Sequence, residues 1–287
     1  MESNNPANRF YAIRFFLIAA GLSLLFGCER KKLEVDRWLE GPENGYAKNQ
    51  PVAIRVFLSR QSQAWVQSQG GAGEIWDLTA NESVARLSAD GPVSVQIRDG
   101  QWQVQLESGA SVIRGPLPGV RILEVRPVGR GVLSYGKEKP FRCRGVLRCI
   151  GEADGGFALV NVLDMESYLK GVVGSEMYAY WHMEALRAQS VASRTYALYQ
   201  MNGKGKAGWD IGSSQSSQVY KGLGQESQRV NRAVEDTRGV VLAYGPDNRE
   251  KLIPAYYSSI CGGHTQDMRG VFGEDLAPLR RSEEHTS

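Results

Sequence analysis

The sequence contains few cysteines and little net charge. Only four of its 287 residues are cysteine, too few for a disulfide scaffold in a chain of this length. The formal net charge is +3 and the basic residues do not cluster, so nucleic acid is not indicated as a partner. The hydrophobic fraction of 42% and the charged fraction of 23% are ordinary for a globular protein with a substantial core.

The apolar run at the N-terminus is too short to cross a membrane. It extends from Phe15 to Phe26, twelve residues, whereas a spanning helix needs about 20. Because Arg9 and Arg14 precede it, the run is typical of an export signal. Residues 25–28, Leu-Phe-Gly-Cys, resemble a lipobox, whose cysteine is acylated after cleavage. We therefore expect a signal peptide over 1–27, a lipid anchor at Cys28 and an extracytoplasmic location, with ordinary cleavage nearby as the alternative.

The last seven residues, 281–287, read like the translation of a sequencing adapter. Such a scar is excluded from reasoning about the fold. We expect the native sequence to stop near Arg280 and the last part of the domain to be missing.

Between these ends the chain predicts a β-rich part and a helical part. Residues 28–50 are polar and form a linker. From 51 to 160, short alternating runs are separated by turn residues, with a hairpin signal at Asp99-Gly100. From 161 to 280 the period becomes helical. The predicted class is α+β, with an antiparallel β-rich N-terminal half and a helical segment packed on mixed strands.

Three helices are predicted in the second part. Asp164 caps a short helix that ends near residue 169. The longest covers 182–201, where apolar residues follow i, i+3, i+4 spacing, and a third covers 226–236. Glu176 falls between a turn of small residues and the start of the long helix. A carboxylate there is placed for proton transfer, or simply interacts with the helix dipole.

Cys143 and Cys149 lie in a stretch that predicts strand. If the strand were continuous, their Cα atoms would be ~20 Å apart, whereas a disulfide needs less than ~7 Å. A bridge between them requires a bend at Gly145, and both alternatives are open.

Five motifs follow one another in the second half. They are Tyr-Leu-Lys-Gly-Val-Val-Gly-Ser-Glu-Met at 168–177, Ala-Gln at 188–189 with Arg-Thr-Tyr at 194–196, Gln-Val-Tyr at 218–220, Ala-Val with Thr-Arg-Gly at 233–239, and Ala-Tyr-Tyr-Ser at 255–258 leading into Cys-Gly-Gly-His-Thr. In this order they resemble the SpoIID/LytB family of cell-wall proteins. The resemblance is close over about 160–280 and weak over the β region.

The resemblance implies a lytic transglycosylase, which cuts peptidoglycan between N-acetylmuramic acid and N-acetylglucosamine, on strands stripped of peptide, and leaves a 1,6-anhydro sugar. The family's catalytic acid maps onto Glu176, within a catalytic core at 161–280. One carboxylate suffices because the sugar's C6 hydroxyl is the nucleophile, whereas ordinary glycosidases need two. The acid must hold its proton near neutral pH, which an apolar pocket favours. The expected pocket residues are Val172, Val173, Met177 and Trp181.

Further side chains are candidates for substrate binding. Gln189 and Arg194 lie on the long helix, where they either hydrogen-bond sugar groups or brace the catalytic loop. Tyr220 and Tyr257 can stack on sugar rings, although buried aromatics are commoner. Ser258 offers a hydroxyl on the substrate side.

No metal or cofactor is expected. Cys261 and His264 are half of a zinc pattern, and a zinc site needs three or four ligands. Some family members carry a Cys and a His-Cys pair just before Gln-Val-Tyr, where this chain has Ser-Ser-Gln-Ser-Ser at 213–217. Three other carboxylates are expected to act as caps or solvated groups: Asp164, Glu166 and Glu184.

Two other function classes stay open. The first is a non-catalytic peptidoglycan-binding protein or an enhancer of a cell-wall amidase, and the second is a metal-dependent hydrolase. The expected partners are peptidoglycan glycan strands, the membrane through the lipid anchor, and a cell-wall amidase.

Overall fold

The computed structural model describes residues 52–106, 108–114, 122–203, 208–246, 250–258 and 266–280. The predicted signal peptide, Cys28, the linker and the adapter-like tail lie outside these residues. Within them, no helix is both long and apolar enough to cross a bilayer.

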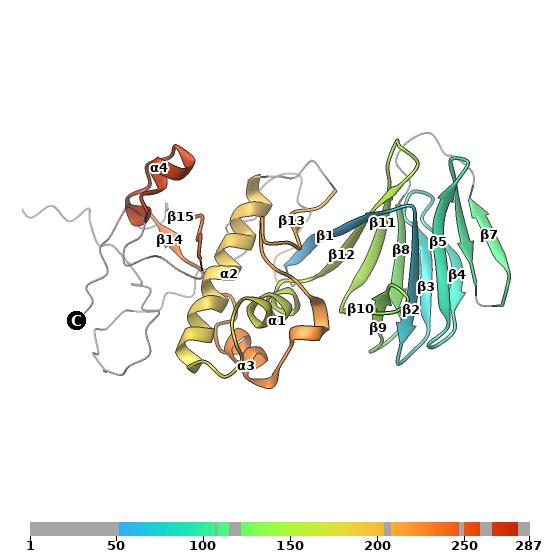
Figure 1. Cartoon of the computed structure of the whole chain (residues 1–287), viewed down its shortest axis with the longest axis horizontal. Helices are drawn as coiled ribbons and strands as arrows, with labels where there is room; N and C mark the ends of the chain where they lie inside the picture. Colours follow the sequence, from blue (N-terminus) through green and yellow to red (C-terminus); the bar gives the residue numbers. More distant parts are fainter. Residues whose placement is uncertain are drawn as a thin grey trace, which may run out of the picture.

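The described strands form two large sheets and a small one (Figure 1). The seven-stranded sheet has the order β13 (Ile211–Gly212), β1 (Ala53–Gln61), β12 (Phe157–Asp164), β11 (Val146–Gly151), β8 (Ile122–Pro127), β3 (Gly73–Asp77) and β4 (Glu82–Leu87). The six-stranded sheet has the order β10 (Phe141–Cys143), β9 (Val132–Tyr135), β2 (Gln63–Gln69), β5 (Pro92–Arg98), β6 (Gln101–Gln105) and β7 (Ser111–Arg114). β14 (Ala243–Tyr244) pairs with β15 (Lys251–Leu252). All described pairs are antiparallel except β1 with β13.

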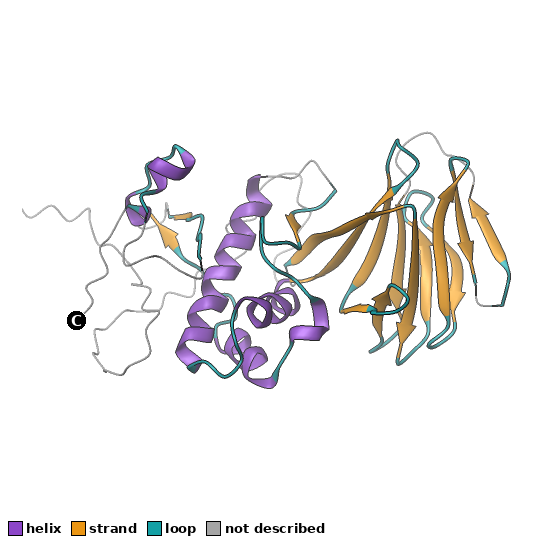
Figure 2. Ribbon diagram, viewed as in Figure 1, coloured by secondary structure: helices purple, strands orange, loops and turns teal. Residues whose placement is uncertain are grey.

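The two large sheets pack face to face as a sandwich (Figure 2). Strands such as β2 and β3 alternate buried and half-exposed residues, so each sheet has one apolar face to bury. One cluster of buried side chains draws on both sheets, and Trp102 of β6 contacts Phe157 of β12 across it. Asp99 and Gly100 join β5 to β6 with φ of 52° and 70°, as a type I′ hairpin turn requires.

Helices pack at the far end of the seven-stranded sheet, where β1 and β12 extend beyond the sandwich (Figure 1). They are α1 (Met165–Glu176), α2 (Met183–Gly203), the 3₁₀ turn η2 (Gly222–Gln225) and α3 (Gln228–Asp236). A second buried cluster joins them to Ile54 and Val56 of β1 and Leu163 of β12. Two shorter elements follow, α4 (Met268–Phe272) and η3 (Ala277–Leu279).

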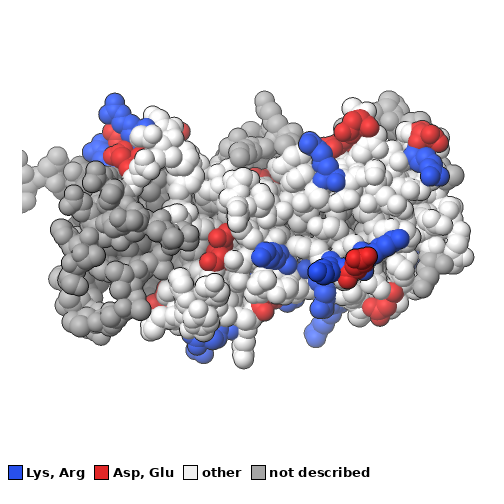
Figure 3. Space-filling view, viewed as in Figure 1, with Lys and Arg blue, Asp and Glu red and all other residues white. Residues whose placement is uncertain are grey.

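This arrangement confirms the predicted α+β class, including the long helix and the third helix. The expected boundary between residues 160 and 161 falls inside β12, which contributes to both clusters. Charged residues of both signs are interspersed on the described part of the face in Figure 3. Among the described residues several charges are paired, such as Arg126 and Arg148 with the buried carboxylate of Glu124.

Cys143 and Cys149 are free thiols on different sheets. Gly145 does mark a bend, with φ of 73°, and an added Cβ there would lie 2.2 Å from the carbonyl oxygen of Val162. The bend carries the chain from one sheet to the other instead of folding a hairpin around a disulfide. Both sulfurs are completely buried in the sandwich core.

Burial raises the pKa of each of these thiols to about 12. Because the thiolate is the reactive form, Cys143 and Cys149 should resist iodoacetamide at pH 8 in the native protein. Both should react once the protein is unfolded in urea. Peptide mass spectrometry reads each position separately, and alkylation of native Cys149 at the unfolded rate would contradict the buried placement.

Candidate active site

Glu176 is the last residue of α1, so its predicted place before a helix start is wrong. The helix begins at Met165, where the Asp164 side chain accepts a hydrogen bond from the Ser167 N–H at 3.0 Å, as predicted. It then continues through the small residues that were interpreted as a turn. At its C-terminal end the helix dipole is negative, so the dipole does not stabilise the Glu176 carboxylate. The helix-dipole interpretation of this residue is therefore also wrong.

Gly171 and Gly174 lie inside α1, and their lack of a side chain lets another segment of the chain pack closely against the helix. A Cβ at Gly171 would lie 2.7 Å from the ring of Tyr220, and one at Gly174 would lie 2.0 Å from the carbonyl oxygen of Gln225. The two glycines therefore let the chain at 220–225 lie directly against α1. Because Gln-Val-Tyr at 218–220 leads into this segment, the contact brings the motif to the end of α1.

We expect Gly174→Ala to destabilise the protein, although alanine is the better helix former in isolation. The added methyl group would displace the backbone at Gln225, and overpacking of this kind costs about 1–3 kcal/mol. Urea unfolding measures the change. Gly224→Ala is the matched control, since a Cβ there meets no atom within 4 Å. A Gly174→Ala protein more stable than wild type would contradict the close approach.

The carboxylate of Glu176 is half-buried and held on one side. Its Oε1 accepts a hydrogen bond from the backbone N–H of Val219 at 2.9 Å. Among the described residues, Oε2 has no hydrogen-bond partner. Two motifs that are 43 residues apart in the chain thus meet at this carboxylate. Val172, Val173, Met177 and Trp181, the expected apolar neighbours, belong to or pack against the core cluster of the same helices.

A buried hydrogen-bond network lies beside this carboxylate and is centred on Gln218. Its Oε1 accepts from the Tyr168 hydroxyl at 3.0 Å. Its Nε2 donates to the Ser193 carbonyl at 3.2 Å and to the Tyr257 hydroxyl at 3.1 Å. Gln218 is fully buried, so its amide links α1, α2 and the chain after β15 without exposure to water.

The two tyrosines of this network stay neutral at ordinary pH. Burial raises the pKa of Tyr257 to about 12, with the negative charge of Glu176 as the next contribution and hydrogen bonds to Ser193 and Gln218 opposing. Burial also raises the pKa of Tyr168 well above its usual value, with smaller contributions from Tyr257, Tyr196 and Glu176. Both hydroxyls therefore remain proton donors near Glu176.

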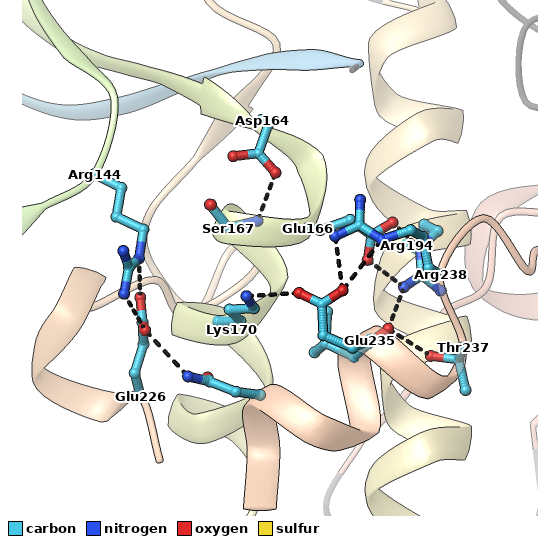
Figure 4. Close-up of polar contacts among 12 residues, drawn as sticks. Arg144, Asp164, Glu166, Ser167, Lys170, Arg194, Glu226, Glu235, Thr237 and Arg238 are labelled. Atoms are coloured by element: carbon cyan, nitrogen blue, oxygen red, sulfur yellow. Dashed lines mark hydrogen bonds and ion pairs between the residues drawn. The ribbon is translucent and has the colours of Figure 1, made fainter. Parts of the chain in front are cut away.

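Arg194 braces the helices and is not available to a sugar. Its Nε and Nη2 donate to Oε1 and Oε2 of Glu166 at 3.0 and 2.7 Å, and its Nη1 donates to the Val240 carbonyl at 3.0 Å. Its side chain is only 1% exposed. Figure 4 shows Glu166 on α1 and Arg194 on α2 facing each other across the helix pair. Of the two roles that the sequence left open, the contacts correspond to the structural one.

Tyr220 and Gln189 are also enclosed. The Tyr220 hydroxyl donates to Oδ1 of Asn161 at 2.7 Å and its ring packs on Tyr168, so it offers no face for stacking. Gln189 is 8% exposed and donates to the Ser193 hydroxyl at 3.1 Å. Tyr257 is half-buried and Ser258 is exposed. Of the predicted substrate-binding residues, these two therefore have side-chain surface that a ligand can reach. Cys261 and His264 lie outside the described residues.

Three groups at the site were missed by sequence reasoning: the Val219 N–H, the Gln218 amide and the Tyr168 hydroxyl. The Gln-Val-Tyr and Tyr-Leu motifs contain all three groups, so a signal is present in the sequence. That signal marks Tyr220 as an aromatic, whereas neither the role of a backbone N–H nor the burial of an amide can be read from a sequence.

The similarity to a known protein family lies in the part of the chain that contains the helices. The model of the stage II sporulation protein family, SpoIID, matches residues 153–244, which include Glu176 and Gln218. The match confirms, over this segment, the predicted resemblance to the SpoIID/LytB family. The matched segment runs from the turn before β12 to β14, so Tyr257 and Ser258 lie just beyond it.

Individual relatives each match about two fifths of the chain. An uncharacterized protein of Brachyspira hyodysenteriae is 41% identical over 116 residues, 40% of this chain and 30% of that protein. The amidase enhancer of Bacillus subtilis is 40% identical over 111 residues, 39% of this chain and 14% of the enhancer. Stage II sporulation protein D of Bacillus amyloliquefaciens is 30% identical over 136 residues, 42% of this chain and 38% of that protein. Each match thus covers well under half of the relative's length.

Proposed function

We propose that this protein is a peptidoglycan lytic transglycosylase in which Glu176 acts first as acid and then as base. The observation that carries the proposal is the Glu176 carboxylate, half-buried at the end of α1 with Oε1 fixed by the Val219 N–H. Because that N–H donates to Oε1, a proton on the acid sits on Oε2. A single oriented proton is what a general acid requires.

The surrounding carboxylates support chemistry with one acid. Asp164 caps α1 and Glu166 pairs with Arg194. Both are at the opposite end of α1, and ten residues of helix separate Glu166 from Glu176 by roughly 15 Å. Glu184 is exposed and pairs with Arg187. None of the three is placed as a second catalytic carboxylate, which the hydrolytic mechanism needs.

The proposed cycle balances without water. Protonated Glu176 gives its proton to the glycosidic oxygen as the bond from that oxygen to C1 of N-acetylmuramic acid breaks. The carboxylate then takes the proton of the C6 hydroxyl of the same sugar, and O6 forms the new bond to C1. The product is a 1,6-anhydro end, and Glu176 is again protonated.

A second function is favoured by the similarity to the Bacillus subtilis amidase enhancer. In that case the protein would bind glycan and stimulate a cell-wall amidase without cutting the strand. Mass spectrometry of peptide-stripped sacculi separates the two functions. Anhydro ends that grow with time on these sacculi support the transglycosylase. An unchanged glycan, together with faster release of peptides from intact sacculi by an added amidase, supports the enhancer.

The membrane anchor is part of the proposal. We expect acylation of Cys28 to hold the protein at the membrane facing the wall. Cys28→Ala should move the protein from the membrane fraction to the soluble fraction on centrifugation of lysed cells. An unchanged distribution would exclude the anchor.

A further inference from the structure

The loop between α1 and α2, which follows Glu176 in the chain, exposes two aromatic rings. Tyr178 and Tyr180 are 64% and 76% exposed. Their rings are nearly parallel, with centroids 5.4 Å apart and an interplanar angle of 17°. Tyr178 also contacts Trp181, whose ring packs against the helical core. Trp181 and the stacked pair of Tyr178 and Tyr180 therefore form an aromatic cluster that leads from the core out to solvent.

The loop that carries the stack is held by α3. The guanidinium of Arg229 donates from Nε to the Ala179 carbonyl and from Nη2 to the Trp181 carbonyl, both at 2.9 Å. The loop ends where the His182 carbonyl accepts from the N–H groups of Ala185 and Leu186 in the first turn of α2. The backbone between the two helices is thus fixed at both sides of Tyr180. Two large rings are thus presented to water on a loop held in place, and an exposed aromatic patch of this kind is a candidate binding site.

Resting on the proposed function, we propose that Tyr178 and Tyr180 form a stacking subsite for a sugar of the glycan strand next to the bond that Glu176 cuts. Tyr178 is two residues from Glu176, so their Cα atoms are at most about 7 Å apart. A polymeric substrate extends past the cleaved bond and must lie on the surface beside the acid. The C–H face of a pyranose ring can pack on an aromatic face while the sugar hydroxyls stay in water. Exposed tyrosine rings such as those of Tyr178 and Tyr180 suit this kind of contact.

Direct binding tests the subsite independently of cleavage. In a Glu176→Gln background, which keeps the glycan intact, the Tyr178→Ala/Tyr180→Ala protein should bind peptide-free glycan strands roughly tenfold more weakly, as expected for the loss of one good stacking contact. The Tyr178→Phe/Tyr180→Phe protein keeps both rings and should bind as the background does. Tyr244→Ala removes an exposed tyrosine of β14 and is the control.

Calorimetry gives the dissociation constants, and urea unfolding shows that each variant is folded. An unchanged dissociation constant in the double alanine protein overturns the subsite. Equal weakening in the double phenylalanine protein also overturns it, since the hydroxyls would then be the binding groups. If wild-type protein makes no anhydro ends, the proposed reaction fails while the binding comparison still decides the subsite. With active Glu176, the double alanine protein should show a raised KM and a largely unchanged kcat.

Discussion

Glu176→Gln should slow the release of 1,6-anhydro sugar products from peptide-stripped sacculi by at least about 100-fold. The substitution changes one atom. The glutamine amide oxygen can still accept the Val219 N–H that holds Oε1 in place, so the end of α1 keeps its geometry. What is lost is the transferable proton, and with it both the protonation of the leaving oxygen and the later removal of the C6 hydroxyl proton.

Glu184→Gln provides the matched control for this experiment. It makes the same chemical change on an exposed carboxylate at the start of α2, where the partner is Arg187. That protein should cut at the wild-type rate. Both variants should unfold at the wild-type urea concentration. A Glu176→Gln protein that is folded and releases anhydro products as fast as wild type would eliminate the acid–base assignment.

Arg194→Met should cost about 3–5 kcal/mol of unfolding free energy. Methionine fills much of the volume of the arginine stem but leaves the Glu166 carboxylate buried without its partner. Glu166 is only 7% exposed, so water cannot replace the two charge-assisted hydrogen bonds at 3.0 and 2.7 Å. Two backbone carbonyls, of Val234 and Val240, lose a donor as well.

The double variant Glu166→Gln/Arg194→Met separates the buried charge from the lost packing. It removes the uncompensated carboxylate and should recover part of the stability lost in Arg194→Met. Arg60→Met, which breaks the exposed pair with Glu152, should cost at most ~1 kcal/mol. A change within ~0.5 kcal/mol for Arg194→Met in urea unfolding would show that the buried pair does not support the helices.

The elements with strong local signals were predictable. The Asp99-Gly100 turn, the Asp164 cap and the long amphipathic helix each depend on residues close together in the chain, and the structure has all three. Glycines in α1 misled the prediction for a physical reason. Gly171 and Gly174 weaken a helix locally, but here they are required by a segment some 50 residues later that packs onto them.

Long-range contacts also decided the roles of the polar candidates. Arg194 and Gln189 stand in a motif, and a motif does not distinguish a residue that touches substrate from one that holds the helices together. The partner of Arg194 is Glu166, which the sequence suggested to be a cap or solvated group. Only the packing of α1 against α2 pairs the two. The Val219 N–H likewise donates to the Glu176 carboxylate only because the chain after Ser217 folds back to the end of α1.

The pairing of the long strands β1 and β12 indicates whether the matched segment, residues 153–244, can fold on its own. The match begins at residue 153 and so includes β12 but not β1. Yet β1 pairs with β12 from Ala53–Asp164 to Gln61–Phe157, and Ile54 and Val56 form part of the base on which the helices rest. Cut out alone, residues 153–244 would carry an open strand edge and an uncovered apolar face. In this protein the segment that holds Glu176 therefore depends for its fold on β1, a strand that lies outside the segment's own boundaries.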